Sequence, residues 1–460
     1  MTALEKLGAY LANGRGLPAS LHANARLHVI DSVGAWIAGI GTAEGRALLG
    51  FRAAMQADVT HLPAAVGTHC GLARLSEIDD IHLAAMTTAG GIVVPAALTL
   101  AAAQETADPA ALARAIVGGY DAMIRLGLAL HGPTILYRGI WPSYFGAAFG
   151  VAAVAARLMR LDERQAANAL ALALTLSAPG VGHHNALTGT RWLAVGFAAR
   201  NGLLAARAAQ AGFTSDLNLL DGRFLASVFD ISPATAELTR GLDQHFMLMD
   251  VSFKPWCAAR QTMAATQAFR DILARGVAPA DILEIEAGVL PPHHGMLDHG
   301  VKAGDRASHL TSLPYQLAVA ALTPAAMFDV AQAPAAIAEP VAGLMAKVMV
   351  TQNERLLARY PKTWPAHVRV ATASGAVHER EVEHIPGDIR EPFDARQVND
   401  KFRRFVTPVL AEEGATRMLT LAVAALDDAP AAAQLLAGIE KACGPHMPSQ
   451  SSPPGKSMLA

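Results

Sequence analysis

The chain has few cysteines and almost no net charge. Its three cysteines, Cys70, Cys257 and Cys443, lie far apart, which excludes a CxxC metal knuckle and argues against an iron–sulfur cluster held by this chain. Lysine plus arginine number 37 against 39 aspartate plus glutamate, a formal net charge of −2. Without a basic excess, neither nucleic acid nor an anionic membrane surface is an expected partner.

The apolar stretches 92–104 and 140–156 contain proline or glycine and are shorter than the roughly 18 to 20 residues of a membrane-spanning helix. The N-terminal residues show no apolar stretch followed by a small-residue cleavage site, so export is not indicated. We therefore expect a soluble, cytoplasmic protein. A chain of 460 residues that is 52% hydrophobic is too long for one compact core, so two domains are expected.

The first half of the sequence predicts helix after helix. Apolar residues recur every three to four positions over 27–37 and 112–126, the spacing of a core-facing helix. Asp108 followed by Pro109 predicts a helix start. Asp162 opens an alanine- and leucine-rich helix to about residue 177, and a further helix over 197–211 is expected to stop at Gly212.

After about residue 250 the pattern favours a small α+β unit. Strands are predicted where β-branched or alternating residues occur, at 282–290, 366–372 and 376–385. Helices are predicted at 313–322 and from Pro340 to about Lys347, and again from Asp394 onward. The proline- and serine-rich residues 446–460 are expected to be a disordered tail.

The segment from Glu77 to His82 carries three carboxylates and an imidazole within six residues. These carboxylates repel one another unless cations lie nearby, so the segment predicts positively charged partners. The alternative is a solvated helix end with acidic capping residues. A DDxxD metal site fits poorly, because Leu83 stands where the third carboxylate should be.

Two further segments place polar residues in apolar surroundings. Residues 137–146 bring Trp141 and other aromatic residues to a helix start, where they can line a carboxylate pocket; simple core filling is the alternative. Residues 183–199 contain the pair His183 and His184 and, further on, Arg191. Adjacent side chains diverge and no HExxH motif accompanies the pair, so a metal site is not expected.

Lysine is scarce, with eight in the chain, and Lys254 lies between Phe253 and Pro255 in an apolar stretch. Such a lysine is expected to bind an anion. Cys257 follows closely, but no paired base is signalled near it, so a buried, inert thiol is the better interpretation.

In their order along the chain, these segments resemble the MmgE/PrpD family, which includes 2-methylcitrate dehydratase, cis-aconitate decarboxylase and iminodisuccinate epimerase. The resemblance covers nearly the whole chain and is most specific at residues 79–95, 196–212, 254–262 and 312–315. It implies a mainly α fold: a large all-helical domain from residues 1–255 and 394–445, a smaller α+β domain from 256–393, a homodimer, and an active site between the domains.

The chain departs from the family pattern at several positions. Thr88 and Trp141 stand where the dehydratase and decarboxylase branches usually have histidine, Arg191 where they have lysine, and Glu77 where aspartate is common. Tyr315, Lys254 and the Asp79–Asp80 pair match the pattern.

The family's reactions place negative charge on carboxylate oxygens, which fixed cations stabilise. We therefore expect Arg191, Arg260 and Lys254 to hold a di- or tricarboxylate, with no cofactor and no metal. His82, its pKa pushed upward by Asp79 and Asp80, is the expected acid or base, and Tyr315 the proton donor on the opposite face. The predicted catalytic residues are His82, Arg191 and Tyr315, and the predicted substrate-binding residues are Asp79, Asp80, Thr88, Trp141, Lys254 and Arg260.

The expected function is a lyase that removes a proton next to a carboxylate of a citrate-like or 2-methylcitrate-like substrate. Two alternatives stay open: an epimerase or isomerase of an imino- or dicarboxylic acid, and a protein that binds a polycarboxylate without catalysis.

Overall fold

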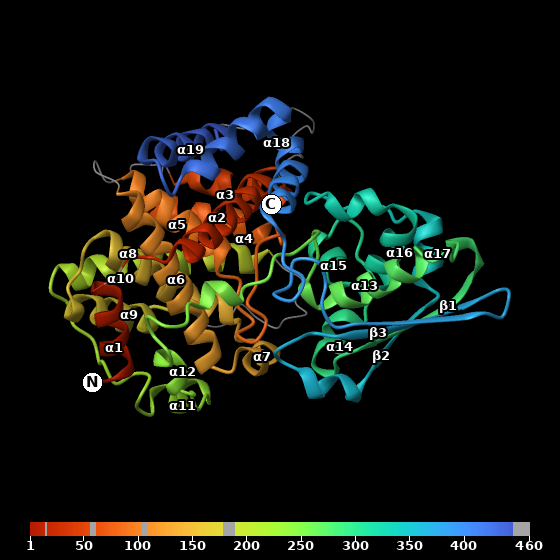
Figure 1. The fold of residues 1–460 in the computed structure, drawn as a ribbon, viewed down its shortest axis with the longest axis horizontal. Helices are drawn as coiled ribbons and strands as arrows, with labels where there is room; N and C mark the ends of the chain where they lie inside the picture. Colours follow the sequence, from red (N-terminus) through yellow and green to blue (C-terminus); the bar gives the residue numbers. More distant parts are fainter. Residues whose placement is uncertain (14–15, 56–60, 104–107, 178–188, 445–460) are drawn as a thin grey trace, which may run out of the picture.

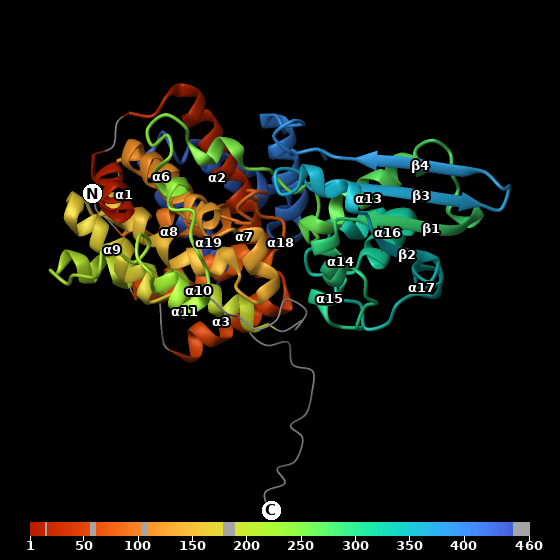
Figure 2. The same ribbon diagram turned by 90° about the horizontal axis from the view of Figure 1, so that it is seen from below.

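The computed structural model describes residues 1–13, 16–55, 61–103, 108–177 and 189–444. Within these ranges a large helical body lies beside a smaller body built on a four-stranded sheet (Figures 1 and 2). The predicted fold class, mainly α with a smaller α+β part, is confirmed. The predicted tail at 446–460 and the pair His183 and His184 lie outside the described residues.

The helical body is built mainly from the N-terminal half of the chain. Its helices are α1 (Ala3–Ala12), α2 (Ala19–Ile40), α3 (Ala43–Ala54), α4 (Leu62–Leu75), α5 (Gly90–Ala102), α6 (Pro109–Ala129), α7 (Gly132–Ile135), α8 (Pro142–Leu158), α9 (Glu163–Thr175), α10 (Thr190–Gln210), α11 (Phe224–Phe229) and α12 (Ala236–Thr239).

The predicted helix starts follow from capping. Asp108 accepts a hydrogen bond from the Ala110 amide at the start of α6, and Asp162 and Gln165 form a reciprocal capping box at the start of α9. Each cap satisfies an amide that has no partner within the helix. Helix α10 starts at Thr190, seven positions before the predicted start at residue 197.

The chain returns to the helical body at its C-terminal end. Helix α18 (Ala395–Ala424) starts at the predicted Asp394 cap and packs along α2, and α19 (Ala429–Ala442) packs on α18 and α5 (Figure 1). The carboxylate of Glu440 on α19 contacts Arg52 of α3 and His69 of α4, at 3.0 and 2.6 Å. The two ends of the sequence therefore share one hydrophobic core.

The smaller body is a four-stranded sheet in the order β2-β1-β3-β4. Its strands are β1 (Ile282–Val289), β2 (Val348–Gln352), β3 (Ala366–Thr372) and β4 (Val377–Val382); β1 pairs in parallel with β2 and antiparallel with β3, which pairs antiparallel with β4. Strands β1, β3 and β4 lie where they were predicted, whereas β2 was not predicted.

Helices α13 (Arg260–Leu273) and α16 (Leu313–Leu322) lie over one face of this sheet (Figure 1), and the shorter helices are α14 (Pro291–Leu297), α15 (Arg306–Thr311) and α17 (Glu339–Met345). Buried side chains between residues 256 and 385 form the second large core. No helix in the described ranges combines the length and apolarity needed to cross a membrane.

Candidate functional site

A small cavity of about 60 Å³ lies between the helical body and the α+β body. Both bodies contribute to its wall, and three helices, α8, α10 and α13, begin at it. The amides in the first turn of a helix have no partner within the helix and favour an anion. The lining residues from the helical body include Arg74, Glu77, Thr88, Trp141, Ser143 and Arg191. Those from residue 254 onward include Lys254, Arg260, Gln261, Met296, Leu310 and Thr311.

The acidic segment and the predicted cations meet at this cavity. Lys254 donates to the Glu77 carboxylate at 3.1 Å, and the Arg191 guanidinium lies 4.0 Å from it. Arg74, at the end of α4, donates to both oxygens of Asp79, at 2.8 and 2.9 Å, and to Glu77 at 3.2 Å. The prediction that cations neutralise the segment from Glu77 to His82 is therefore confirmed, and the solvated helix end is wrong, because Glu77, Asp79 and Asp80 are buried.

The two carboxylates of this cluster respond differently to their surroundings. Burial disfavours the ionised form of Glu77, but Arg74, Lys254 and Arg191 outweigh it and hold its pKa well below the usual range. Burial dominates at Asp79 and raises its pKa to about 6, against the opposing pull of Arg74 and Lys254. Glu77 is thus a permanent anion, whereas Asp79 can take up a proton in mildly acidic solution.

Glu77 also has an unusual backbone conformation. Its φ angle is +59°, in the left-handed region that residues other than glycine rarely adopt. With the backbone in this conformation, the Glu77 carboxylate accepts hydrogen bonds from the side chains of Arg74 and Lys254. Residues held in such conformations concentrate at functional sites, because the surrounding structure must stabilise them.

Arg260 is held from the α+β side. Its Nη2 donates to both oxygens of Asp388, at 2.7 and 2.8 Å, and the guanidinium lies 5.8 Å from the ring centre of Trp364. Both partners of this ion pair are buried. Counting Asp388, four cations around the cavity face three carboxylates, which leaves an excess of one positive charge when Asp79 is ionised.

Aromatic rings fix the position of Arg191. Its guanidinium lies 4.1 Å from the ring centre of Trp192 and 5.5 Å from that of Trp141, close enough for cation–π attraction. Trp141 in turn stacks on Tyr144. The predicted binding residue Trp141 is therefore a wall of the cavity and a support for Arg191.

The remaining polar atoms of the wall are mostly donors. In the part of the chain that the structure describes, the buried polar side-chain atoms of lining residues without a hydrogen-bond partner are Nε of Arg74, Nε1 of Trp141, Nε of Arg191, and Nε and Nη1 of Arg260. All of them are N–H groups. Because buried donors without a partner are costly, this cavity is suited to a ligand rich in acceptor oxygens.

Thr88 and Ser143 supply hydroxyl groups to the same wall. Both the amide and the hydroxyl of Thr88 donate to the Ser143 Oγ, at 3.0 and 2.9 Å. With its lone pairs engaged, Ser143 retains its own O–H for donation. The position where relatives usually have histidine is thus part of a hydroxyl pair in this chain.

Asp80 does not line the cavity. Its carboxylate accepts hydrogen bonds from the Gly90 amide at 2.8 Å and from Tyr120 at 2.6 Å, and lies 2.7 Å from Nδ1 of His28. Both oxygens are occupied and fully buried. Asp80 therefore anchors the start of α5 and positions the segment that carries Glu77 and Asp79.

The structure places His82 behind the cavity wall, which its neighbours Ile81 and Met86 line. Nδ1 of His82 accepts from the Ala85 amide at 3.1 Å, so Nε2 carries the proton in the neutral ring. Burial lowers the pKa of His82 to about 4. The predicted upward shift is wrong, because loss of water contact outweighs nearby negative charge and Asp80 is engaged elsewhere.

Tyr315 lies outside the interdomain cavity. Its ring packs edge-on against His309, with ring centres 4.7 Å apart, and lines a separate, smaller cavity with Cys257. Leu310 borders both cavities. Burial raises the pKa of both the Tyr315 hydroxyl and the Cys257 thiol, the latter to about 11. The inert, buried thiol expected for Cys257 fits this environment.

The structure thus brings together Thr88, Trp141, Arg191, Lys254 and Arg260 around one cavity, with Asp79 directly behind it. Sequence reasoning missed Arg74, Ser143 and Asp388. Arg74 is a lone charge in the apolar stretch that ends α4, a signal that could have been noticed. Asp388 lies in a loop with no such signal.

Two family models match this chain. The MmgE/PrpD N-terminal domain matches residues 10–234, and the MmgE/PrpD C-terminal domain matches residues 256–428. A search of curated proteins found no match. The two matched regions account for most of the sequence, and Lys254 lies in the interval between them, just before the second match begins. The chain therefore belongs to the MmgE/PrpD family.

Proposed function

We propose that this protein is a cofactor-independent lyase that removes a proton next to a carboxylate of a di- or tricarboxylate, such as citrate or 2-methylcitrate. The observation that carries the proposal is the set of unpartnered buried N–H groups on Arg74, Trp141, Arg191 and Arg260 around one cavity. A carboxylate supplies the acceptors these donors lack, and the excess positive charge favours an anion.

In this proposal the arginines stabilise the charge that forms when the proton leaves. Removing a proton next to a carboxylate drives electron density onto the carboxylate oxygens. Arg191 and Arg260 are positioned in advance by Trp192 and Asp388, so little reorganisation is needed during the reaction. The guanidinium groups stay charged throughout, so they bind and orient but do not carry the proton.

Lys254 is the best-placed proton carrier. Apart from arginine, Lys254 and Glu77 are the acid–base side chains among the lining residues of the interdomain cavity, and the low pKa of Glu77 makes it a weak base. Because Lys254 is paired with Glu77 as an ammonium, it must first release a proton to solvent; it then accepts the proton from carbon and returns it to the departing β-hydroxyl as water leaves. His82 and Tyr315, the original candidates, are not on the cavity wall.

A single proton carrier favours elimination over epimerisation. Epimerisation by two bases needs an acid–base group on each face of the reacting carbon, and Tyr315, the expected donor for the second face, borders another cavity. Non-catalytic polycarboxylate binding is the second candidate, because internal carboxylates already pair with Lys254 and Arg260.

The test is a substrate screen with 2-methylcitrate, citrate, cis-aconitate and iminodisuccinate. Absorbance of the unsaturated product detects elimination, and proton exchange in deuterated water detects carbanion formation. We expect product and exchange with at least one tricarboxylate. Exchange without net elimination supports an epimerase, and binding without exchange supports the non-catalytic alternative.

A further inference from the structure

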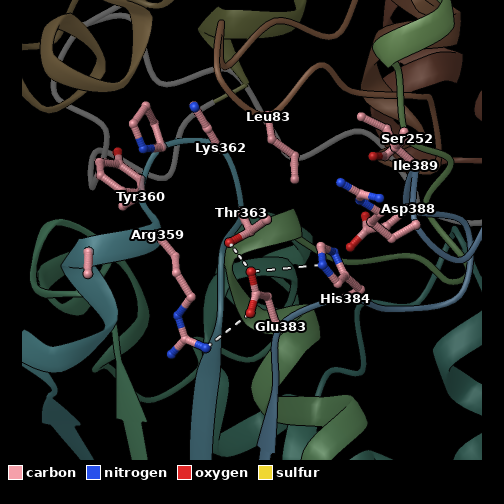
Figure 3. A pocket seen from close by; sticks show the side chains of 13 residues that line it. Leu83, Ser252, Arg359, Tyr360, Lys362, Thr363, Glu383, His384, Asp388 and Ile389 are labelled. Carbon is pink, nitrogen blue, oxygen red and sulfur yellow. Dashed lines mark hydrogen bonds and ion pairs between the residues drawn. The ribbon is translucent and has the colours of Figure 1, made fainter.

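A second and much larger cavity lies on the other side of the site wall. Its volume is about 620 Å³, within the range of about 300 to 1,000 Å³ that is typical of small-molecule sites. Figure 3 shows its lining side chains around an open space, with Leu83 and Ser252 from the helical body facing residues 358–363 and 383–390 of the α+β body.

The carboxylates that line this cavity are already paired. Glu383 accepts hydrogen bonds from Arg359 and from the Thr363 hydroxyl, each at 3.1 Å. Asp388 pairs with Arg260, as described above. Neither carboxylate is therefore free to neutralise another cation in this cavity.

Two lining cations, by contrast, have no carboxylate partner. Lys362 and Arg390 are exposed and make no ion pair within the described ranges. The Tyr360 hydroxyl at the same cavity is buried and has no hydrogen-bond partner there. The cavity thus combines two uncompensated positive charges with a free hydroxyl, which is the chemistry of an oxyanion site.

The same two segments of the chain contribute residues to both cavities. The segments at 81–83 and 252–254 are bridged, with Ile81 paired to Ser252. Ile81 lines the interdomain cavity and Leu83 the larger one, while Ser252 lines the larger cavity and Lys254 the interdomain one.

Asp388 also links the two cavities. Its carboxylate borders the larger cavity and holds Arg260, which lines the interdomain cavity. The same loop is attached beside Lys254, because the Phe253 amide donates to the Gly387 carbonyl at 2.9 Å. Gly387 has φ +97°, and a Cβ there would lie 2.6 Å from the Phe253 carbonyl oxygen, so the contact depends on glycine.

We propose that the larger cavity is a second binding site, for a small oxyanion carried as a carboxylate or a phosphate, with Lys362 and Arg390 as its charged ligands. An ion bound there lies next to Asp388 and competes electrostatically for the positive charge of Arg260. Occupancy of the second site then changes how firmly Arg260 is held toward the interdomain cavity. The binding itself does not depend on the reaction proposed above.

Isothermal titration of the full chain with inorganic phosphate and, separately, with succinate tests this site. We expect at least one probe to bind, and the double variant Lys362→Ala/Arg390→Ala to weaken that binding about tenfold or more. The probe whose binding is weakened by Lys362→Ala/Arg390→Ala identifies the ion of this site as phosphate or carboxylate. Absence of binding by both probes overturns the proposal.

Two controls separate this site from other causes. The variant Lys302→Ala/Arg355→Ala removes the same charge from exposed positions outside the cavity and should bind like the wild type; equal weakening in both double variants overturns the proposal. Arg191→Ala should retain binding of the probe that Lys362→Ala/Arg390→Ala weakens. If Arg191→Ala abolishes it while Lys362→Ala/Arg390→Ala does not, the ion occupies the interdomain cavity and the second site is refuted, whatever reaction the protein catalyses.

Discussion

The Glu77 carboxylate lies 3.1 Å from Nζ of Lys254, although 177 positions separate the two residues in the chain. The Glu77 carboxylate pairs with cations that a substrate would otherwise contact. An incoming polycarboxylate must share or displace it. Glu77 therefore stabilises the fold by neutralising buried cations, and for the same reason it weakens the binding of an anionic ligand.

Replacing Glu77→Gln should separate these two effects. Without the negative charge, Arg74, Lys254 and Arg191 repel one another in a buried space, so the free energy of unfolding should fall by about 3–5 kcal/mol. Affinity for citrate should rise, because the cations lose their internal competitor. Thermal unfolding and calorimetric titration measure the two changes, with the exposed Glu413→Gln as the neutral control. A drop in citrate affinity would show that Glu77 assists binding.

Replacing Arg191→Ala should lower kcat/KM by about 10²- to 10³-fold, because a positioned cation is lost where charge develops. The matched control is Arg200→Ala on the same helix, where the guanidinium lies over Phe197 and does not line the interdomain cavity. Its kcat/KM should stay within a few-fold of wild type. Equal losses in both variants would mean that α10 itself was disturbed.

Lys254→Met should abolish proton exchange from the substrate in deuterated water, whereas Tyr315→Phe should leave it near the wild-type rate. The physical reason is location: Lys254 lines the interdomain cavity, and Tyr315 packs against His309 at another. Rates are followed by the absorbance of product and by loss of the exchanging proton signal. A large loss of turnover in Tyr315→Phe would return Tyr315 to the mechanism as a proton donor.

Ligand binding should weaken as the pH rises through about 6. Below this value Asp79 is protonated and the cavity cluster has more positive charge; above it Asp79 ionises and part of that charge is neutralised. The dissociation constant of a dicarboxylate measured at pH 5 and pH 7.5 should therefore increase with pH. Asp79→Asn cannot ionise, so its pH dependence reflects the ligand alone, and an identical profile in both proteins would exclude Asp79.

The ionised carboxylate of Glu440 should stabilise the packing of α19 on the helical body. His69 and Arg52 outweigh the effect of burial on Glu440 and lower its pKa from 4.5 to about 2. Its contribution is thus complete above about pH 4.5 and is lost as the pH falls toward about 2. Glu440→Gln should cost about 1–3 kcal/mol at pH 6, and the difference should shrink at pH 3, as measured by urea unfolding. A difference independent of pH would point to packing instead.

Much of the fold could be predicted from local signals. Asp108, Asp162 and Asp394 marked helix starts because capping depends on residues within one turn. Strand β2 escaped prediction because its short segment, Val348–Gln352, is stabilised by parallel pairing with β1, a contact that local periodicity does not reveal. Lys254, Arg191 and Arg260 stood out as charges in apolar surroundings, and all three line the interdomain cavity.

The sequence by itself determined the family, the helical class and three of the four cations that meet between the two bodies, because capping, periodicity and isolated charges are local properties of the chain. Only the tertiary structure decided which carboxylate each cation faces, that His82 is buried and neutral, and that Tyr315 borders another cavity. Ion pairing and desolvation depend on distances between residues far apart in the chain, and those distances exist only once the two bodies have packed together.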